Sequence, residues 1–203
     1  GVDALKEQLR SLVALSERGG LKDEGRDEEI LRTFEALERE NPTKAPLESD
    51  LLQGEWELIW TSSESILGLN RPWPFRPKAE KPILQYLDPK RNYARNLEYT
   101  PTGQNSVEAT IKPLTAEERQ AFTSKLDSFL MFKYNADEEK GGTYIPDERG
   151  IEQTTVGVKF EYFKVFGWLK IKAPEKATGI LQITYLDDDL RLSRGDRGNL
   201  FVL

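Results

Sequence analysis

Two residue types that commonly carry enzyme chemistry are missing from this 203-residue chain, which contains neither cysteine nor histidine. Without cysteine there are no disulfides, thiol nucleophiles or thiolate metal ligands. Without histidine there is no Ser-His-Asp triad, no imidazole base and no histidine-ligated zinc. Carboxylates, lysine, tyrosine, arginine and hydroxyls remain, but no spaced carboxylate pair stands out as an acid and base. These absences argue against catalysis without excluding it. We predict a protein that is not an enzyme, with no catalytic residue and no metal ligand.

Basic charge and long apolar runs are also scarce. The chain has 29 lysines and arginines against 35 aspartates and glutamates, a net charge of −6. An acidic chain is poorly suited to bind nucleic acid, or to reach anionic membranes by charge alone. No apolar run approaches the ~20 residues that span a bilayer, so we expect a soluble or peripheral protein. Because the sequence starts at glycine, we expect that any targeting peptide has been removed.

Two helices are predicted before the first strand. Between residues 3 and 17, apolar side chains recur at helical spacing, and Gly19-Gly20 ends the pattern. A second stripe occupies residues 27–40, and Asn41-Pro42 ends it. We assign residues 1–46 to an N-terminal helical pair that packs on the outside or across one end of the remaining domain.

From residue 51 onward, the pattern changes to short alternating runs separated by turn residues. These runs give roughly eight to nine strands with mostly short connections, which favours an antiparallel sheet because parallel strands need crossover helices. Large aromatic side chains on the expected inner faces favour a barrel over a sandwich. We predict a mainly β fold in which residues 47–203 form an antiparallel β-barrel with a helical insertion at about 115–150. The helix in this insertion is predicted over residues 115–135.

The most distinctive segment is the C-terminal one. Residues 180–186 alternate as a strand does, and the acidic run Asp187-Asp188-Asp189 predicts a solvated turn rather than a calcium loop. From Leu190 to Leu203 the chain reads Leu-Arg-x-Ser-Arg-Gly-Asp-x-Gly-Asn-Leu-Phe-Val-Leu. This pattern resembles the C-terminal signature of the plastid-lipid-associated proteins, also called fibrillins or plastoglobulins.

The resemblance extends over nearly the whole chain. The segments that occur in family order include Arg18-Gly19, Asn41-Pro42, Leu51 to Leu58, Thr61-Ser62, Ile66-Leu67-Gly68, Arg71-Pro72 and Val158-Lys159-Phe160. The resemblance implies a plastid (chloroplast) protein at thylakoid membranes or plastoglobules, present as a mature chain without its transit peptide. It implies that the protein binds, stores or transfers hydrophobic small molecules such as prenyl quinones, carotenoids or lipids, with no other cofactor.

A second resemblance concerns the start of the sheet. Gly54-x-Trp56 is similar to the first-strand motif of lipocalin-like barrels, in which an arginine from a late strand stacks over the tryptophan and closes the barrel. Arg194 shares a face with the leucines of its strand, so we predict that Arg194 is this arginine and that Arg191 points the other way. Such a cation–π contact contributes ~0.5–2 kcal/mol.

Alternation along the strands gives a set of side chains expected to line the barrel interior. They are Trp56, Leu58, Trp60, Phe160, Tyr162, Ile183 and Tyr185. Such a face can form a pocket for an apolar ligand, or it can simply fill the core. The residues alone favour a filled core, and the family resemblance makes the two interpretations about equal.

Two further segments are candidate contacts with a membrane or a partner. The Pro-rich loop at 71–77 carries Trp73 and Phe75, whose rings suit a membrane interface or pack on the barrel itself. The predicted 115–135 helix carries Phe129, Met131 and Phe132, which suit a lid, a partner surface or ordinary packing. An alternative function is therefore a scaffold that coats lipid bodies or docks on a thylakoid protein complex. Another is a non-catalytic auxiliary of prenyl-lipid synthesis.

Overall fold

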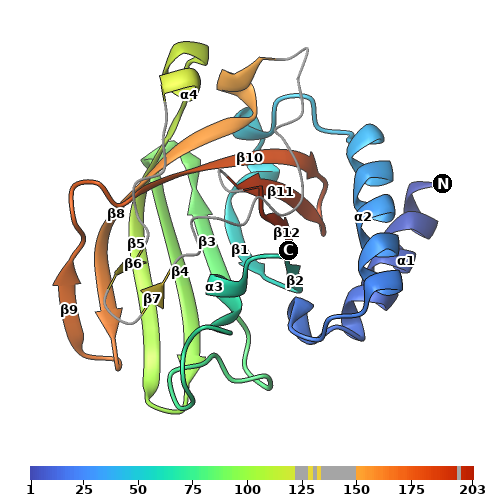
Figure 1. The fold of residues 1–203 in the computed structure, drawn as a ribbon. Coiled ribbons are helices and arrows are strands. Elements are labelled where there is room, and N and C mark those ends of the chain that lie inside the picture. The colour runs from blue at the N-terminus through green and yellow to red at the C-terminus, as the bar shows by residue number, and fades with distance from the viewer. Residues whose placement is uncertain (122–127, 130–131, 134–149, 196–197) are drawn as a thin grey trace.

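A layer of helices stands beside a curled antiparallel sheet in the computed structural model (Figure 1). The structure describes residues 1–121, 128–129, 132–133, 150–195 and 198–203. The α-helices of this part of the chain are α1 (Val2–Ala14), α2 (Glu24–Arg39), α3 (Glu64–Leu67) and α4 (Ala116–Ala121). None of the described helices is both long and apolar enough to cross a membrane.

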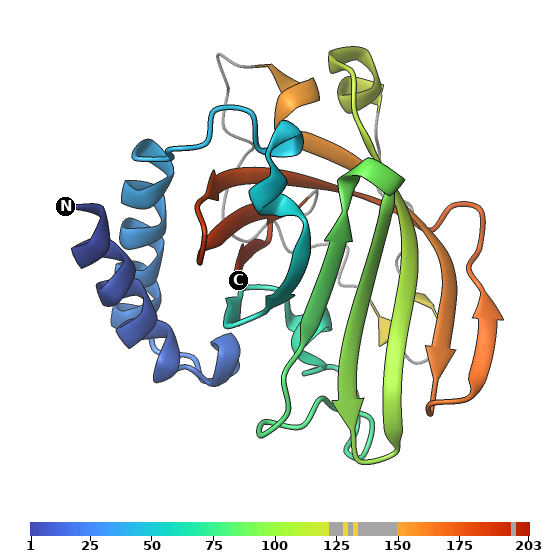
Figure 2. The same cartoon turned by 180° about the vertical axis from the view of Figure 1, so that it is seen from behind.

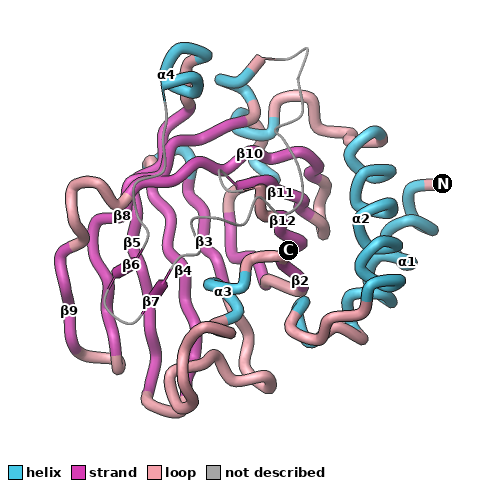
Figure 3. Tube along the Cα trace, viewed as in Figure 1, coloured by secondary structure: helices cyan, strands magenta, loops and turns pink. Residues whose placement is uncertain are grey.

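The sheet makes up most of the molecule, as Figure 3 shows. Its strands are β1 (Gly54–Glu57), β2 (Trp60–Thr61), β3 (Leu84–Asp88), β4 (Tyr93–Thr100), β5 (Gly103–Pro113), β8 (Thr155–Val165), β9 (Leu169–Lys172), β10 (Thr178–Leu186), β11 (Arg191–Gly195) and β12 (Leu200–Val202). Among the described residues their order is β1-β3-β4-β5-β8-β10-β11-β12-β2, and β9 pairs with β8. Each pairing is antiparallel, as the short connections between the strands predict.

The first and last strands in this order are consecutive in the chain, separated only by Leu58 and Ile59. The Leu58 N–H donates to the Ile83 carbonyl beside β3, and the Ile59 N–H donates to the Val202 carbonyl in β12, both at 2.9 Å. One bent segment therefore pairs with both ends of the curled sheet. The prediction of a mainly antiparallel β fold with N-terminal helices is confirmed, although the sheet is a half-barrel rather than a complete barrel.

Helices α1 and α2 pack on the outer face of β10, β11, β12 and β2, to one side of the sheet (Figures 1 and 2). The helical stripe is buried because its leucines, Ile30 and Phe34 pack on Trp60, Tyr185 and Leu192 of the sheet. Helix α2 begins after Asp23, whose carboxylate accepts a hydrogen bond from the Arg26 N–H at 2.9 Å. This capping satisfies one of the free N–H groups at the start of the helix.

Two bulges decide which way the later side chains point. On β8, Tyr162 pairs with Glu108 and Phe160 pairs with Ala109, so one extra residue lies between them. On β10, Ile183 pairs with Ser193 and Tyr185 pairs with Leu192, with the same result. Because side chains alternate across a strand, each extra residue moves the following side chains to the opposite face.

The prediction of a single helix over residues 115–135 is wrong, because residues 128–129 and 132–133 form strands. Helix α4 ends at Ala121, and two short antiparallel strands follow, β6 (Ser128–Phe129) and β7 (Phe132–Lys133). Phenylalanine favours strands, so the aromatic residues that fit helical spacing here also suit a hairpin. The chain turns at Phe166-Gly167, because β8 ends at Val165 and β9, which pairs with it, begins at Leu169.

Candidate ligand cavity

The inner face of the half-barrel forms a cavity of about 290 Å³ that is open to solvent on one side. This volume lies at the lower end of the range of small-molecule pockets, which is roughly 300–1,000 Å³. Most of its wall is apolar and comes from strands far apart in the sequence. The apolar lining side chains are Leu58, Ile66, Ile83, Leu84, Leu97, Val107, Val158, Phe160, Phe163, Val165, Ile180, Leu181, Phe201 and Leu203.

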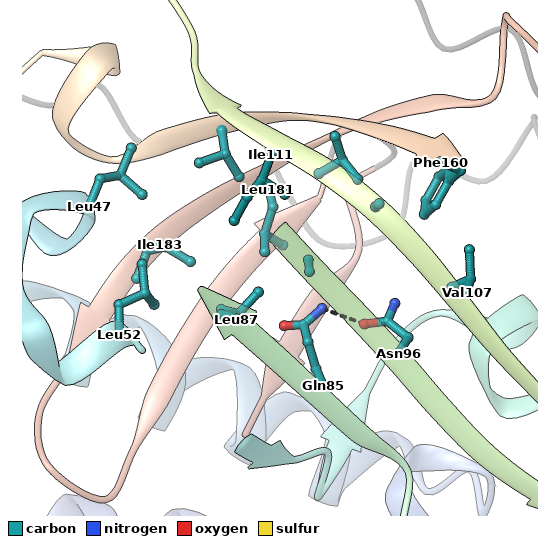
Figure 4. Close-up of a pocket in the computed structure, with 14 residues that line it drawn as sticks. Leu47, Leu52, Gln85, Leu87, Asn96, Val107, Ile111, Phe160, Leu181 and Ile183 are labelled. Atoms are coloured by element: carbon teal, nitrogen blue, oxygen red, sulfur yellow. Dashed lines mark hydrogen bonds between the residues drawn. The ribbon is translucent and has the colours of Figure 1, made fainter. Parts of the chain in front are cut away.

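A second, narrower hollow of about 40 Å³ adjoins this cavity (Figure 4). The two share part of their walls, including Gln85, Asn96, Val107, Phe160 and Leu181. The narrow end is closed by leucine and isoleucine side chains. It has room for about one water molecule, since a water takes up roughly 30 Å³ of liquid volume. The interior therefore has one wide compartment, lined by both polar and apolar side chains, and one narrow apolar end.

A polar chain crosses this apolar interior. The Arg191 guanidinium donates through Nη2 to the Gln85 side-chain oxygen. The Gln85 Nε2 in turn donates to Asn96 Oδ1 at 3.0 Å, as Figure 4 shows. Arg191 also lies over the Trp56 ring, with its Cζ 5.2 Å from the ring centre. Burial lowers the pKa of Arg191 to about 9, which still leaves the group protonated at neutral pH. The cavity wall thus carries a buried cation.

A second buried arginine lies elsewhere on the cavity wall and is paired. Arg71 donates to both carboxylate oxygens of Glu98, at 2.7 and 3.1 Å, and to the Phe75 carbonyl at 3.0 Å. Its side chain holds the 71–77 loop against β4. The ion pair with Glu98 occupies the Arg71 guanidinium and fixes it inside the protein.

The structure separates the seven predicted lining residues into three groups. Leu58, Phe160 and Ile183 line the cavity or its narrow end. Trp56 lies in the same buried cluster and reaches the cavity through Arg191. The remaining three are corrections: Trp60, Tyr162 and Tyr185 do not line the cavity.

Each correction has a local cause. Trp60 faces the helices because the bent segment passes from β1 to β2 between Glu57 and Trp60, so simple alternation from Trp56 fails. The bulge in β10 turns Tyr185 toward the helices, where it is fully buried. The bulge in β8 turns Tyr162 outward, where the Lys170 Nζ lies 4.2 Å from its ring centre.

The choice of the closing arginine was also wrong. Arg194 does share a face with the leucines of its strand, but that face is the outer one. There Arg194 forms a buried ion pair with Glu38 of α2, with Nε–Oε2 and Nη2–Oε1 distances of 2.9 and 2.6 Å. Arg191 occupies the position over Trp56 that was assigned to Arg194. Gly54, the third residue of the predicted closure, begins β1 with a φ of +139°, a conformation that favours glycine.

The sequence also carried a signal that was missed. Gln85 and Asn96 face inward from β3 and β4, where their strands otherwise supply apolar side chains to the interior. A polar residue at an inward position needs a partner, so this pair could have indicated a polar feature inside the sheet.

The predicted contact loop forms part of an exposed aromatic surface at one end of the sheet. We call it the aromatic tip; it consists of Trp73, Phe75, Phe166 and Trp168. The rings of Phe75 and Phe166 lie 6.4 Å apart and join the 71–77 loop to the turn between β8 and β9. Trp73 and Trp168 are 75% and 73% exposed.

The other predicted contacts fall at the edge of the described chain. Met131 lies outside the described residues, and for Phe129 and Phe132 the structure describes only the strands to which they belong. They stay a prediction.

The acidic turn after β10 is tied to the helical layer. Lys6 of α1 donates to Asp187 at 2.8 Å and to Asp189, and Tyr185 donates to Asp187 at 2.6 Å. Burial alone would raise the pKa of Asp187, but the hydrogen bonds from Lys6 and Tyr185 lower it to about 2. Burial and the hydrogen bond to Asp187 raise the pKa of Tyr185. The turn is therefore an anchor for α1, as well as the solvated turn that the sequence predicts.

Comparison with known proteins identifies relatives along nearly the full chain. The PAP_fibrillin family model matches residues 3–203. The chain is 31% identical to "Probable plastid-lipid-associated protein 5, chloroplastic" of Arabidopsis thaliana, over 98% of this chain and 68% of that protein. It is 28% identical to "Plastoglobulin-1, chloroplastic" of Pisum sativum, over 86% of this chain and 53% of that protein. No solved structure matches the chain.

A third relative is a chromoplast protein. The chain is 30% identical to "Chromoplast-specific carotenoid-associated protein, chromoplastic" of Cucumis sativus, over 86% of this chain and 59% of that protein. The chain thus spans about half to two thirds of the length of these relatives. Their names place them in plastids and with lipid or carotenoid.

Proposed function

The chain belongs to the PAP_fibrillin family of plastid-lipid-associated proteins, and from this premise we propose that it binds a hydrophobic small molecule in its half-barrel. The plastid location expected from the terminal signature is confirmed by the chloroplastic and chromoplastic relatives. The observation that carries the proposal is the cavity of about 290 Å³ with a mostly apolar wall. Prenyl quinones, carotenoids and lipids are the candidate ligands. The chain acts as a binding protein rather than an enzyme.

The driving force for binding is desolvation of the ligand. Each 100 Å² of apolar surface removed from water contributes about 2.5 kcal/mol, offset by the lost freedom of the ligand. The cavity holds the volume of about ten water molecules, so it accepts a short chain or one end of a longer molecule. A carotenoid or a long prenyl tail would extend beyond it.

The test uses two tryptophan substitutions that add the same bulk at different places. Leu181→Trp fills the cavity wall, whereas Leu169→Trp adds the ring at an exposed position on β9. We expect the neutral probe N-phenyl-1-naphthylamine to bind the native protein and the Leu169→Trp variant, and a short-tailed plastoquinone analogue to displace it. The Leu181→Trp variant is expected to lose at least about tenfold in affinity. Equal binding by the two variants, or no binding by the native protein, would contradict the proposal.

We further propose that the aromatic tip contacts the surface of a lipid body or membrane. Exposed tryptophans are favoured at the interface between lipid and water. On the neighbouring β8–β9 hairpin, Lys164, Lys170 and Lys172 are exposed. Each lysine near an anionic lipid surface adds about 1 kcal/mol of attraction. The aromatic tip and the hairpin beside it therefore combine exposed aromatic rings with positive charge, the two features that favour binding to an anionic lipid surface, although the chain as a whole is acidic.

Vesicle flotation tests the tip separately from the cavity. Trp73→Ser with Trp168→Ser removes the two exposed rings, and the matched control Leu15→Ser with Leu21→Ser removes two exposed leucines from the helical side. With vesicles containing phosphatidylglycerol, we expect the first pair to abolish co-flotation and the control pair to leave it unchanged. If both pairs float like the native protein, the tip is not the lipid contact. Binding only to a protein complex would favour the scaffold function instead.

A further inference from the structure

Three arginines of the described chain are buried, and only one of them lacks an acidic partner. Arg71 pairs with Glu98, and Arg194 pairs with Glu38. Arg191 is 1% exposed, and no described side-chain carboxylate forms an ion pair with it. Its Nη2 donates to Gln85, but among the described residues its Nε and Nη1 have no hydrogen-bond partner. This arginine lies on the wall of the cavity.

An unpaired buried cation is costly, because the protein has removed it from water without replacing the lost interactions. The Trp56 ring covers the guanidinium on one side and partly compensates, since a cation over an aromatic face is attracted to it. A ring face accepts no N–H hydrogen bond of the usual strength, however. Two nitrogen donors of Arg191 therefore remain without a partner beside a space that the described part of the chain does not fill.

We propose that Arg191 anchors the acidic head of an amphiphilic ligand whose apolar chain occupies the cavity. The proposal rests on the proposed function, and it narrows the ligand class to molecules that carry an oxyanion, a carboxylate or a phosphate, at one end. The guanidinium presents its donors in a planar fork that matches the two oxygens of such a head. Gln85 and Asn96 lie next to it on the same wall and supply further polar contacts.

The rest of the cavity suits the other end of such a ligand. Phe160, Ile180 and Leu181 come from β8 and β10, the two strands that precede β11 in the sheet, and line the same cavity. A neutral molecule of the same shape would gain these apolar contacts, but it would leave the cation unpaired. The expected signature is thus a preference for the charged head over its neutral equivalent.

Binding is compared for three ligands with the same twelve-carbon chain, namely dodecanoate, methyl dodecanoate and dodecyl phosphate, measured by calorimetry at pH 8. We expect dodecanoate or dodecyl phosphate to bind about 10- to 100-fold more tightly than the methyl ester, the usual effect of a charge-assisted hydrogen bond. The relative affinities of the two acids show which head the site prefers. Equal affinities for all three ligands would refute the anchor and leave the apolar cavity intact. No binding of any of them would argue against the cavity as well.

Two variants locate the preference at Arg191. Arg191→Met is expected to lower the affinity for the better acid to that of the ester, while Arg95→Met, on the exposed face of β4, leaves the preference unchanged. Gln85→Glu places a carboxylate next to Arg191 and is expected to abolish the preference while raising the melting temperature. A preference that persists in both Arg191→Met and Gln85→Glu would refute the assignment.

A measurement on the native protein tests the proposal without any variant, so misfolding of a variant cannot affect the result. The carboxyl carbon of [1-¹³C]dodecanoate is followed by NMR as the pH is lowered. Next to a buried guanidinium, the bound acid should titrate at least one pH unit below the free acid. A bound carboxyl that titrates at or above its ordinary pKa does not contact Arg191, and the proposal then fails.

Discussion

The buried ion pair between α2 and the sheet makes a sharp prediction about stability. Glu38→Ala removes the carboxylate that accepts two hydrogen bonds from Arg194. The arginine stays 6% exposed against the Phe34 ring and loses the carboxylate of Glu38. Removing one partner of such a pair typically costs 3–5 kcal/mol, because it leaves a buried charge uncompensated. The free energy of unfolding of a folded domain is about 5–15 kcal/mol in total, so the variant should fold with little stability left.

Urea denaturation measures this cost, and α2 supplies its own control. With a slope of about 2 kcal/mol per M, Glu38→Ala should lower the midpoint by about 1.5–2.5 M. Glu28 forms an exposed pair with Arg32 four residues along the same helix, at 3.2 Å. Glu28→Ala should cost only about 0.3–0.5 kcal/mol.

A double substitution separates the pair from the packing around it. Glu38→Met with Arg194→Met replaces two buried charges by apolar side chains of similar length. It should recover most of the lost stability, since buried pairs are often no better than well-packed apolar residues. The reasoning is refuted if Glu38→Ala costs no more than Glu28→Ala, or if the double variant is as unstable as the single one.

Three further predictions concern the anchors of the helical layer and the cavity. The pKa of Asp187 is lowered to about 2 from its ordinary 3.8, so its contribution is complete above about pH 4 and is lost as the pH falls through 2. We expect the free energy of unfolding to fall by about 1–2 kcal/mol between pH 4 and pH 2, after allowing for solvent screening. Urea titrations at each pH measure this fall, and it should be absent in the Asp187→Asn variant. Gly19→Ala should cost at least about 2 kcal/mol, because φ is +102° and the added methyl would collide with the Thr61 carbonyl oxygen. The control Gly25→Ala lies in the first turn of α2 with space around it, so it should leave the stability unchanged or raise it slightly. Thermal melts of the two variants measure the difference. Gln85→Leu should cost about 1–3 kcal/mol, since it removes the one described hydrogen-bond acceptor of the Arg191 guanidinium, and a melting temperature equal to that of the native protein would contradict this.

The sequence predicts most elements of this fold because local signals mark them. Helical spacing, Gly19-Gly20 and Asn41-Pro42 define the helical pair, and the alternating runs define most of the strands. The faces of those strands were predicted less well. Alternation assigns Tyr162 and Tyr185 to the interior, but a bulge in each strand moves them outside. A bulge is set by the partner strand, so the periodicity of a single strand does not reveal it.

The same limitation explains the arginine error. Arg194 does share a face with Leu192 of β11 and with the preceding Leu190, as predicted. Which face is the inner one depends on the position of α1 and α2, and therefore on contacts across more than 150 residues, such as that between Glu38 and Arg194. The polar part of the cavity wall also depends on contacts between distant segments. Gln85, Asn96 and Arg191 come from three strands, and no local pattern fixes the register of those strands.

The bent segment that carries β1 and β2 has a consequence for how the protein folds. Its second half pairs Trp60 with Val202, near the other end of the chain. Before that ladder forms, the two sheet ends have no backbone link beyond the segment itself, and a long loop must be closed to join them. Contacts so distant in sequence slow folding to milliseconds or seconds. On the ribosome, this last pairing must wait until β12 has emerged, so β2 and the outer strand faces stay exposed until then. A nascent chain of this protein therefore has a late and vulnerable step that chaperones would be well placed to protect.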